Sequence, residues 1–286
     1  MTRAQALSHG SALLSAPSPS PALDAEVLLA YACGCNRSEL LAHLEEPLPL
    51  LRGWRFRWLI HRRWSGIPVA YLTHEKEFYG RSFYVNRYVL TPRPETELMI
   101  EAALGTIHAN GSIATIIDVG TGSGCIAITL ALELPHLKVL ATDTSAPALA
   151  VAKKNATHYG VDTRITFLRG NLIKPLLATP YPLLSNSLLL ANLPYLTTDE
   201  IKGELTSEPR DALDGSSDGL KYYRLLIEQL MTLPPISLPR CLILELHPPT
   251  ALAINELLRQ AWPRAQLTLQ LDLKGLKRVV VVKLEN

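Results

Sequence analysis

A short apolar segment that runs into a glycine-dense turn constrains the fold of this chain more than any other feature. Residues 116–119 have the composition of a buried strand, glycines stand at positions 120, 122 and 124, and residues 126–134 are suited to a helix. Glycine permits a tight turn and lets a ligand lie against bare backbone. The order of strand, turn and helix predicts the first unit of an α/β sheet that binds a ligand at this turn.

The remainder of the chain continues this alternation of strand and helix. Apolar runs that predict buried strands cover residues 113–119, 138–142, 165–168, 188–191 and 241–246, and helical segments cover residues 146–159, 219–232 and 250–260. Such alternation predicts a parallel sheet that helices cover on both faces. Residues 266–272 and 278–284, on either side of Lys274-Gly275, predict a closing antiparallel hairpin.

Two shorter parts precede this α/β core. Residues 1–74 carry helical periodicity and predict a small helical domain. Short strand-like pieces on either side of Gly80 predict a hairpin linker over residues 75–97. The core itself is expected to span residues 98–286.

The overall composition disfavours several classes of protein. The chain has 28 basic and 26 acidic residues, and a net charge of only +2 gives it no strong overall attraction for nucleic acid. Its four cysteines lack the paired spacing of a zinc site. The N-terminus has no signal-peptide pattern, and no run approaches the roughly 20 apolar residues that span a bilayer. We therefore expect a cytoplasmic protein that neither enters a membrane nor binds nucleic acid stably.

The glycine turn and one acidic residue together indicate the type of ligand. Glycines at 120, 122 and 124 do not match the spacing G-x-G-x-x-G of dinucleotide-binding turns. Asp143 stands at the end of the next expected strand, where a carboxylate can accept hydrogen bonds from both hydroxyls of a ribose. The turn and Asp143 therefore predict a site for an adenosyl ligand rather than for NAD.

A second polar motif follows the expected strand at residues 188–191. Asn192, Leu193, Pro194 and Tyr195 stand at the carboxyl end of that strand, which is the sheet edge where α/β proteins bind ligands. The Asn192 side-chain oxygen and the Leu193 carbonyl can accept both N–H bonds of a planar NH2 group, and Tyr195 can stack on that group. Alignment of a nitrogen in this way suits methyl transfer, which requires no metal and no nucleophilic side chain.

Three motifs resemble those of known methyltransferases. The pattern Asp-x-Gly-x-Gly-x-Gly, which begins at Asp118, resembles the first motif of class I S-adenosylmethionine-dependent methyltransferases. Asn-Leu-Pro-Tyr at 192–195 is similar to the Asn-Pro-Pro-Tyr motif shared by the HemK/PrmC glutamine methyltransferases and by enzymes that methylate amino groups of DNA bases. Pro-Arg-Pro-Glu-Thr-Glu at 92–97 resembles a signature of the HemK/PrmC family. Further matches to that family, which extend the resemblance over nearly the whole chain, lie at residues 68–72, 78–80, 208–215, 218–220, 272–275 and 278–280.

The resemblance to the HemK/PrmC family implies a fold, a cofactor and a substrate. It implies a class I, Rossmann-like methyltransferase core with a helical N-terminal domain that binds substrate, and S-adenosyl-L-methionine as the methyl donor. The implied substrate is the glutamine of the Gly-Gly-Gln motif in peptide chain release factors, so these factors are the expected partners. Residues expected at the cofactor are Gly120, Thr121, Gly122, Ser123, Gly124, Asp143, Asn171, Leu172 and Asn192, and those expected at the acceptor glutamine are Asn192, Leu193, Pro194 and Tyr195.

Several positions depart from the family pattern and leave two alternatives open. The departures are Leu193 for the first proline of the acceptor motif, Asn171 for an aspartate that approaches the adenine, Ser216 for a glycine, and Glu245-Leu246-His247 for Glu-x-Gly. One alternative is methylation of an amino group in nucleic acid, which the near-zero net charge disfavours. The other is an S-adenosylmethionine-binding module that has lost turnover.

The densest basic and aromatic segment, residues 52–64, has two interpretations. Its arginines and tryptophans can bind a protein partner or RNA. The favoured interpretation is an amphipathic helix in which Trp54 and Trp58, four residues apart, pack inward. Glu95 and Glu97, near Arg93, can contact the cofactor or belong to a surface ion-pair network, and the network is the favoured interpretation. We interpret His247 as structural.

Overall fold

The computed structural model describes residues 1–16, 18–109, 111–177 and 184–284. The chain divides into two compact units. The first comprises Met1–Glu75 and Gly203–Ser207, and the second comprises Lys76–Lys202 and Glu208–Asn286. The finer division after residues 74 and 97 stays a prediction. No helix within the described ranges is both long enough and apolar enough to cross a membrane.

The first unit is a helical bundle with its own hydrophobic core. Its helices are α1 (Arg3–Leu14), α2 (Pro21–Cys33), α3 (Arg37–Ala42), α4 (Leu50–Trp64) and α5 (Val69–Thr73). Thr2 is the N-cap of α1 and forms a capping box with Gln5. Pro21 occupies the first turn of α2, where a missing N–H is tolerated. Leu28, Leu29 and Leu59 are among the fully buried side chains that hold the helices together.

A buried arginine joins the separate segment Gly203–Ser207 to this bundle. Arg63 of α4 is only 3% exposed and donates from Nε to Asp24 of α2 at 2.6 Å. Its Nη2 pairs with Glu204. Both carboxylates neutralise one buried guanidinium, and the pair with Glu204 connects a segment far along the chain to the helical bundle.

The expectation that Trp54 and Trp58 pack inward is wrong. The structure leaves 66% of Trp54 and 57% of Trp58 exposed. The buried face of α4 is formed instead by Phe56, Leu59 and Ile60, which recur at the three- and four-residue spacing of a helix. The two tryptophans lie on the other side, where arginines of the same helix stack on their rings. Aromatic residues four positions apart therefore share a face, but their spacing does not say whether that face is buried.

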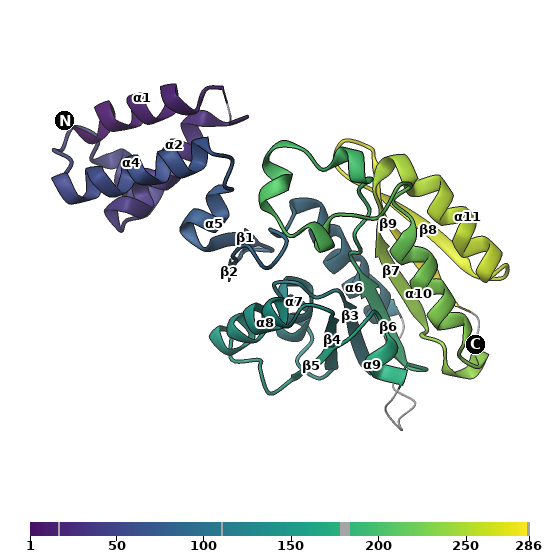
Figure 1. Ribbon diagram of the computed structural model, residues 1–286. Helices are drawn as coiled ribbons and strands as arrows, with labels where there is room; N and C mark the ends of the chain where they lie inside the picture. The colour runs from purple at the N-terminus through teal and green to yellow at the C-terminus, as the bar shows by residue number, and fades with distance from the viewer. Residues whose placement is uncertain (17, 110, 178–183, 285–286) are drawn as a thin grey trace. The chain divides into compact units, whose positions relative to one another are not determined.

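The second unit is built on a seven-stranded sheet with the order β5-β4-β3-β6-β7-β9-β8 (Figure 1). Its strands are β3 (Thr115–Val119), β4 (Lys138–Asp143), β5 (Ile165–Arg169), β6 (Ser187–Ala191), β7 (Cys241–Glu245), β8 (Gln266–Leu271) and β9 (Lys277–Lys283), and a separate two-stranded sheet pairs β1 (Glu75–Phe78) with β2 (Arg81–Tyr84). Strands β3 to β7 are parallel, whereas β9 runs antiparallel to β7 and β8. The predicted parallel sheet and its closing antiparallel hairpin are confirmed.

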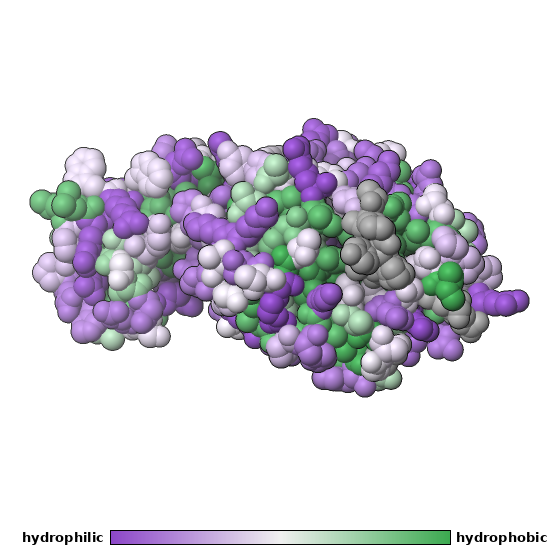
Figure 2. Space-filling view, turned by 90° about the horizontal axis from the view of Figure 1, so that it is seen from below, coloured by the Kyte–Doolittle hydropathy of each residue, from purple (hydrophilic) through white to green (hydrophobic). Residues whose placement is uncertain are grey.

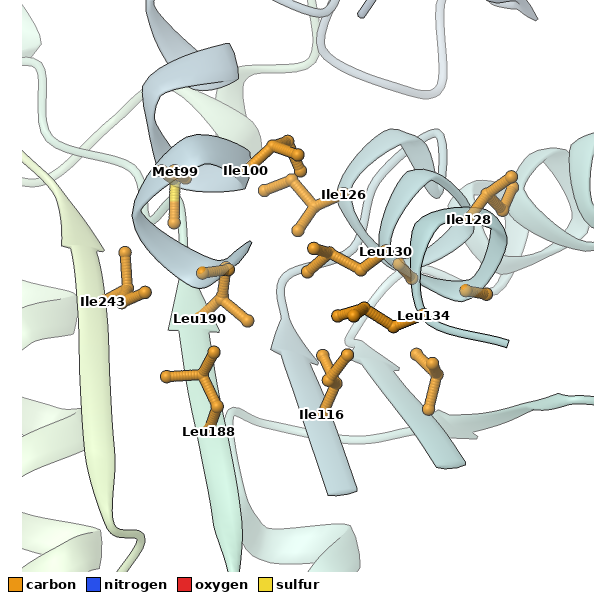
Figure 3. Packing of buried hydrophobic residues seen from close by; sticks show 14 of the residues in the cluster. Met99, Ile100, Ile116, Ile126, Ile128, Leu130, Leu134, Leu188, Leu190 and Ile243 are labelled. Atoms are coloured by element: carbon orange, nitrogen blue, oxygen red, sulfur yellow. The ribbon is translucent and has the colours of Figure 1, made fainter. Parts of the chain in front are cut away.

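Helices cover both faces of this sheet. They are α6 (Glu97–Ala109), α7 (Cys125–Glu133), α8 (Ala146–His158), α9 (Lys174–Leu177), α10 (Lys221–Met231) and α11 (Ala251–Ala261). Short 3-10 turns of the second unit lie at Pro94–Thr96, Thr198–Glu200, Arg210–Ala212, Pro235–Ser237 and Pro248–Thr250, and the turn at Gly203–Ser207 belongs to the first unit. Successive side chains of a strand point to opposite faces. Ile116 accordingly belongs to the apolar cluster with α6 and α7, and Ile117 to the cluster with α10 and α11. Figure 3 shows the first cluster, in which side chains of α6 and α7 point at Ile116 and Leu190 of the sheet.

The central strands are buried along their whole length. Every residue of β3, β6 and β7 is buried. Parallel strands with helices on both faces are expected to be continuous apolar runs rather than alternating ones. Figure 2 shows that apolar side chains also reach the surface in places, among hydrophilic ones.

Candidate functional site

Four strands bring the residues that follow them to one edge of the sheet. Val119 of β3 pairs with Thr142 of β4 and with Ala191 of β6, and Ala191 pairs with Leu244 of β7. These strands are parallel, so the next residues of all four lie at the same edge. The strand order also reverses here, because β4 lies on one side of β3 and β6 on the other. Crevices at such a reversal are the usual ligand sites of open α/β sheets.

A cavity of about 440 Å³ opens at this edge. Its volume lies within the usual range for small-molecule sites. Of the residues expected at the site, those that line the cavity are Gly120, Thr121, Gly122, Ser123, Asp143, Asn171, Leu172, Asn192, Leu193 and Pro194. Gly124 and Tyr195 adjoin these residues in the chain but are not part of the lining. The structure therefore brings the glycine turn and the acceptor motif to one cavity.

The glycine turn uses backbone conformations that favour glycine. Gly120, Gly122 and Gly124 have φ angles of 77°, 54° and 81°, in the left-handed region that other residues rarely adopt. Gly120 and Gly122 line the cavity, and without side chains they leave the backbone open to a ligand. Gly124 instead begins α7, where it packs against Ile128 and Ala152.

A buried aspartate holds this turn in shape. Asp118 is 1% exposed, and its Oδ2 accepts from Thr121 Oγ1 at 2.6 Å and from Ala127 N at 3.2 Å. Burial raises the pKa of the Asp118 carboxyl to about 6, although both hydrogen bonds oppose that shift. The first residue of the Asp-x-Gly-x-Gly-x-Gly pattern is therefore a support of the turn.

Replacing Gly124 by alanine is expected to lower the free energy of unfolding by about 2–4 kcal/mol. A Cβ at this position would lie 2.9 Å from Ile128 Cδ1 and 3.1 Å from Ala152 Cβ, and the φ angle of 81° is unfavourable for alanine. Urea denaturation measures the change. Gly105→Ala in α6 is the matched control, because among the described residues a Cβ there would meet no atom within 4 Å beyond its chain neighbours and the backbone of its own helix. Equal destabilisation by the two variants would contradict this explanation.

Asp143 connects the end of β4 to the glycine turn. Its Oδ2 accepts from Gly122 N at 2.9 Å, and its Oδ1 accepts from Ser145 N at 2.8 Å. Burial raises the pKa of the Asp143 carboxyl, and these backbone N–H groups oppose the shift. A carboxylate has about four acceptor sites, so Asp143 can still accept hydrogen bonds from a ligand in the cavity.

Asn171 and Leu172 form another part of the cavity lining. Gly170 N donates to the Asp143 carbonyl at 2.9 Å, which brings both residues to the end of β4. Leu172 is buried with a left-handed φ of 51°, whereas Asn171 is exposed. An apolar wall beside an amide that can donate and accept suits a flat nitrogen heterocycle.

A hydrogen-bond network connects Asn192 to a buried glutamate. Asn192 Nδ2 donates to Thr96 Oγ1 at 3.1 Å, and Thr96 Oγ1 donates to Glu245 Oε2 at 2.6 Å. Tyr195 OH donates to the other carboxyl oxygen of Glu245, Oε1, at 3.1 Å. Glu245 is 1% exposed, and burial raises its pKa to about 7 while the hydroxyls of Thr96 and Tyr195 oppose the shift. Because the Asn192 nitrogen bonds to Thr96, the amide oxygen is available to a ligand in the cavity.

Tyr195 also stacks on His247. The two ring centroids are 5.4 Å apart and the rings are nearly parallel, at 6°. His247 Nε2 lies 3.0 Å from Glu200 Oε1. Burial, and then the nearby Glu245, raise the pKa of the Tyr195 hydroxyl above its usual value. His247 thus covers one face of the Tyr195 ring, and stacking of Tyr195 on a substrate stays a prediction.

Sequence reasoning missed Thr96 and Glu245 as members of the site. Within the Pro-Arg-Pro-Glu-Thr-Glu motif it drew attention to Glu95 and Glu97, which do not line the cavity, whereas Arg93 of the same motif does. Glu97 Oε1 accepts from Tyr79 N at 2.9 Å, and Glu95 Oε1 lies 3.9 Å from Arg278 Nη2. Membership of the motif is a signal for Thr96, but its partner Glu245 is 149 residues away in the chain. Only the tertiary structure brings the two together.

Family models match both parts of the chain. A model described as PrmC N-terminal domain matches residues 5–73, and one described as Methyltransferase small domain matches residues 96–194. A release factor glutamine methyltransferase of Moorella thermoacetica is 44% identical over 231 residues, which cover 79% of this chain and 80% of the relative. Another, of Bacillus anthracis, is 34% identical over 267 residues, which cover 91% of this chain and 92% of the relative.

Solved structures share the fold at lower identity. The catalytic domain of human METTL16 in complex with MAT2A 3'UTR hairpin 6 has a TM-score of 0.58 and 18% identity, and the match covers 76% of this chain and 81% of that chain. The N-terminal domain of human METTL16 in complex with SAH has a TM-score of 0.53 and 21% identity, and the match covers 73% of this chain and 77% of that chain. At these identities the similarity concerns the fold alone, and it confirms the class I, Rossmann-like core expected from the sequence.

Proposed function

Because this chain belongs to the release factor glutamine methyltransferase family, we propose that it methylates the glutamine side chain in the Gly-Gly-Gln motif of peptide chain release factors. Relatives of that name are 34–44% identical to it over most of both chains. The methyltransferase domain in the second unit makes the protein a methyltransferase. Release factors act in translation, so this substrate implies a cytoplasmic location.

S-adenosyl-L-methionine is the methyl donor in this proposal, and the residues of the cavity fit it. When bound, it supplies a methyl group that a positively charged sulfur has already activated. Asp143 has free acceptor sites for the ribose hydroxyls, since two of its sites hold backbone N–H groups. Gly120 and Gly122 expose backbone towards the methionine part, while Asn171 and Leu172 suit the adenine.

The orientation of the Asn192 amide is the observation that carries this proposal. Its nitrogen donates to Thr96, so its oxygen can accept one N–H of a glutamine side chain. The Leu193 carbonyl can accept the other N–H, and the two acceptors together would align the glutamine nitrogen. An amide nitrogen is a weak nucleophile, because its lone pair is delocalised into the carbonyl. Alignment at near-attack distance is therefore the main task of the enzyme. The methylated nitrogen then loses one proton readily to water, without a dedicated base.

Mass spectrometry of a release factor incubated with this protein and labelled cofactor tests the proposal. We expect one added methyl group on the glutamine of the Gly-Gly-Gln motif, and none on a release factor in which alanine replaces that glutamine. DNA and RNA incubated in parallel are expected to gain no label. Label on nucleic acid alone would indicate an amino-group methyltransferase, and cofactor binding without any transfer would indicate a module without turnover.

A further inference from the structure

The acceptor motif is connected on two sides to one buried carboxyl group. Glu245 accepts from Tyr195 through Oε1, and through Oε2 it accepts from Thr96, which in turn accepts from Asn192. We propose that Thr96 and Glu245 are positioning residues, which orient the Asn192 amide so that its oxygen faces the acceptor glutamine. This inference rests on the proposed function and adds two residues to its acceptor site.

The donors and acceptors of this network have a single possible order when Glu245 is ionised. A carboxylate accepts but cannot donate, so the Thr96 hydroxyl gives its only hydrogen to Oε2. The Thr96 oxygen is then an acceptor towards Asn192, and only the NH2 end of the Asn192 amide can donate to it. The amide oxygen is left for the cavity, which Asn192 lines. Without this network the two ends of the amide would be nearly interchangeable, because they have almost the same size.

Packing holds the members of the network in place. Tyr223 OH donates to the Glu245 backbone carbonyl at 2.6 Å. Thr96, 2% exposed, lies directly before α6. Figure 3 shows Met99 of α6 pointing towards Ile243 of β7, and both belong to one apolar cluster. The start of α6 and the end of β7 are therefore fixed against each other, which leaves the hydrogen bonds little freedom.

The burial of Glu245 is difficult to explain by stability alone. A buried carboxylate is costly unless a charge is paired with it. Within the described part of the chain, the side chains that bond directly to the Glu245 carboxyl are the neutral hydroxyls of Thr96 and Tyr195. Arg278 lowers the Glu245 pKa, but its own Nε donates to Asp272 at 2.9 Å. A role in setting the order of donors accounts for an acceptor-only group at this position.

Protonation of Glu245 would disturb that order. A proton on Oε2 would be donated to Thr96, whose own hydrogen would then point towards Asn192 and oppose the NH2 group. Because the pKa of Glu245 is raised to about 7, we expect kcat to fall as the pH decreases from 8 to 6. The other titratable or charged groups that face Glu245 are Glu95, Cys125, Tyr195, Tyr223 and Arg278.

Glu245→Gln is expected to raise the melting temperature relative to the parent protein, and to do so more at pH 8 than at pH 6. The folded pKa of Glu245, about 7, lies above the ordinary value of 4.5. Its contribution to stability is therefore fully present below about pH 4.5, declines as the pH rises and is lost once the pH passes about 7, whereas glutamine stays neutral. The difference between the two melting temperatures should widen by about 2–4 °C over this interval. A difference that does not depend on pH would refute the ionisation on which the donor order depends.

Thr96→Val tests the donor order itself, because it replaces one hydroxyl by a methyl group. We expect kcat to fall about 10- to 100-fold, with KM for the release factor and the dissociation constant of S-adenosylhomocysteine each within about threefold of the parent values. Thr96→Ser, which restores the hydroxyl, should recover kcat to within about threefold. In Glu245→Gln, kcat should no longer change with pH between 6 and 8.

Thr129→Val in α7 is the matched control for Thr96→Val. Thr129 is also fully buried, and its hydroxyl has no hydrogen-bond partner among the described residues. Its kcat should equal that of the parent protein. The positioning role would be overturned if Thr96→Val kept the kcat of the parent protein, or if Thr96→Val and Thr129→Val lost kcat equally. In either case, methylation of glutamine by the parent protein would still support the proposed function. If the parent protein itself transfers no methyl group to glutamine, the proposed function and this inference are both refuted.

Discussion

Replacement of Asn192 by alanine is expected to lower kcat for release factor methylation by about 100- to 1000-fold. The variant loses the oxygen proposed to accept a glutamine N–H, together with the nitrogen that donates to Thr96. The dissociation constant of S-adenosylmethionine should stay within about threefold, because the proposed ribose contact belongs to Asp143. Steady-state kinetics and isothermal titration calorimetry measure the two quantities separately.

Asn186→Ala is the matched control, because Asn186 directly precedes β6 and Asn192 directly follows it. Asn186 is exposed, and its Oδ1 accepts from Arg240 at 3.3 Å. Loss of the Asn186 side chain, at the other end of the strand, is expected to leave kcat unchanged. Equal losses of turnover and of cofactor affinity in Asn192→Ala would contradict a role in orienting the nucleophile.

The strands of the second unit could be predicted from the sequence because burial on both faces makes them continuous apolar runs. The expected strand at 188–191 corresponds to Ser187–Ala191, and the one at 138–142 corresponds to Lys138–Asp143. Glycines mark the turn after β3 equally clearly, since each adopts a conformation that other residues avoid. Local chemistry determines these features, and a single sequence therefore reveals them.

The connections between the motifs could not be predicted in this way. Thr96 and Glu245 form a hydrogen bond because the start of α6 lies close to the end of β7. The sequence around either residue has no pattern that predicts contact with the other. The prediction that the tryptophans of α4 pack inward was wrong for a related reason. Helical spacing groups Trp54 with Trp58, but the neighbouring helices of the bundle determine which face of α4 is buried. Tertiary contacts carry this information, and spacing along one helix does not.

Replacement of Asp143 by alanine is expected to weaken the binding of S-adenosylmethionine by at least about 100-fold. A hydrogen bond to a charged group contributes about 1.5–3 kcal/mol, and the proposal assigns two ribose hydroxyls to this carboxylate. The same carboxylate holds Gly122 N at 2.9 Å and Ser145 N at 2.8 Å, so its loss also loosens the glycine turn. Calorimetry with S-adenosylhomocysteine measures the effect without any turnover.

The kcat of Asp143→Ala at saturating cofactor should return to within about tenfold of the parent value, because the acceptor residues follow a different strand, β6. Asp143→Asn should bind with intermediate affinity, since it keeps the size of the side chain and one acceptor oxygen. Asp162→Ala, at an exposed position, controls for the loss of one negative charge. Unchanged cofactor affinity in Asp143→Ala would mean that other residues bind the ribose. A loss of kcat that saturating cofactor does not restore would mean that Asp143 contributes to the methyl transfer itself.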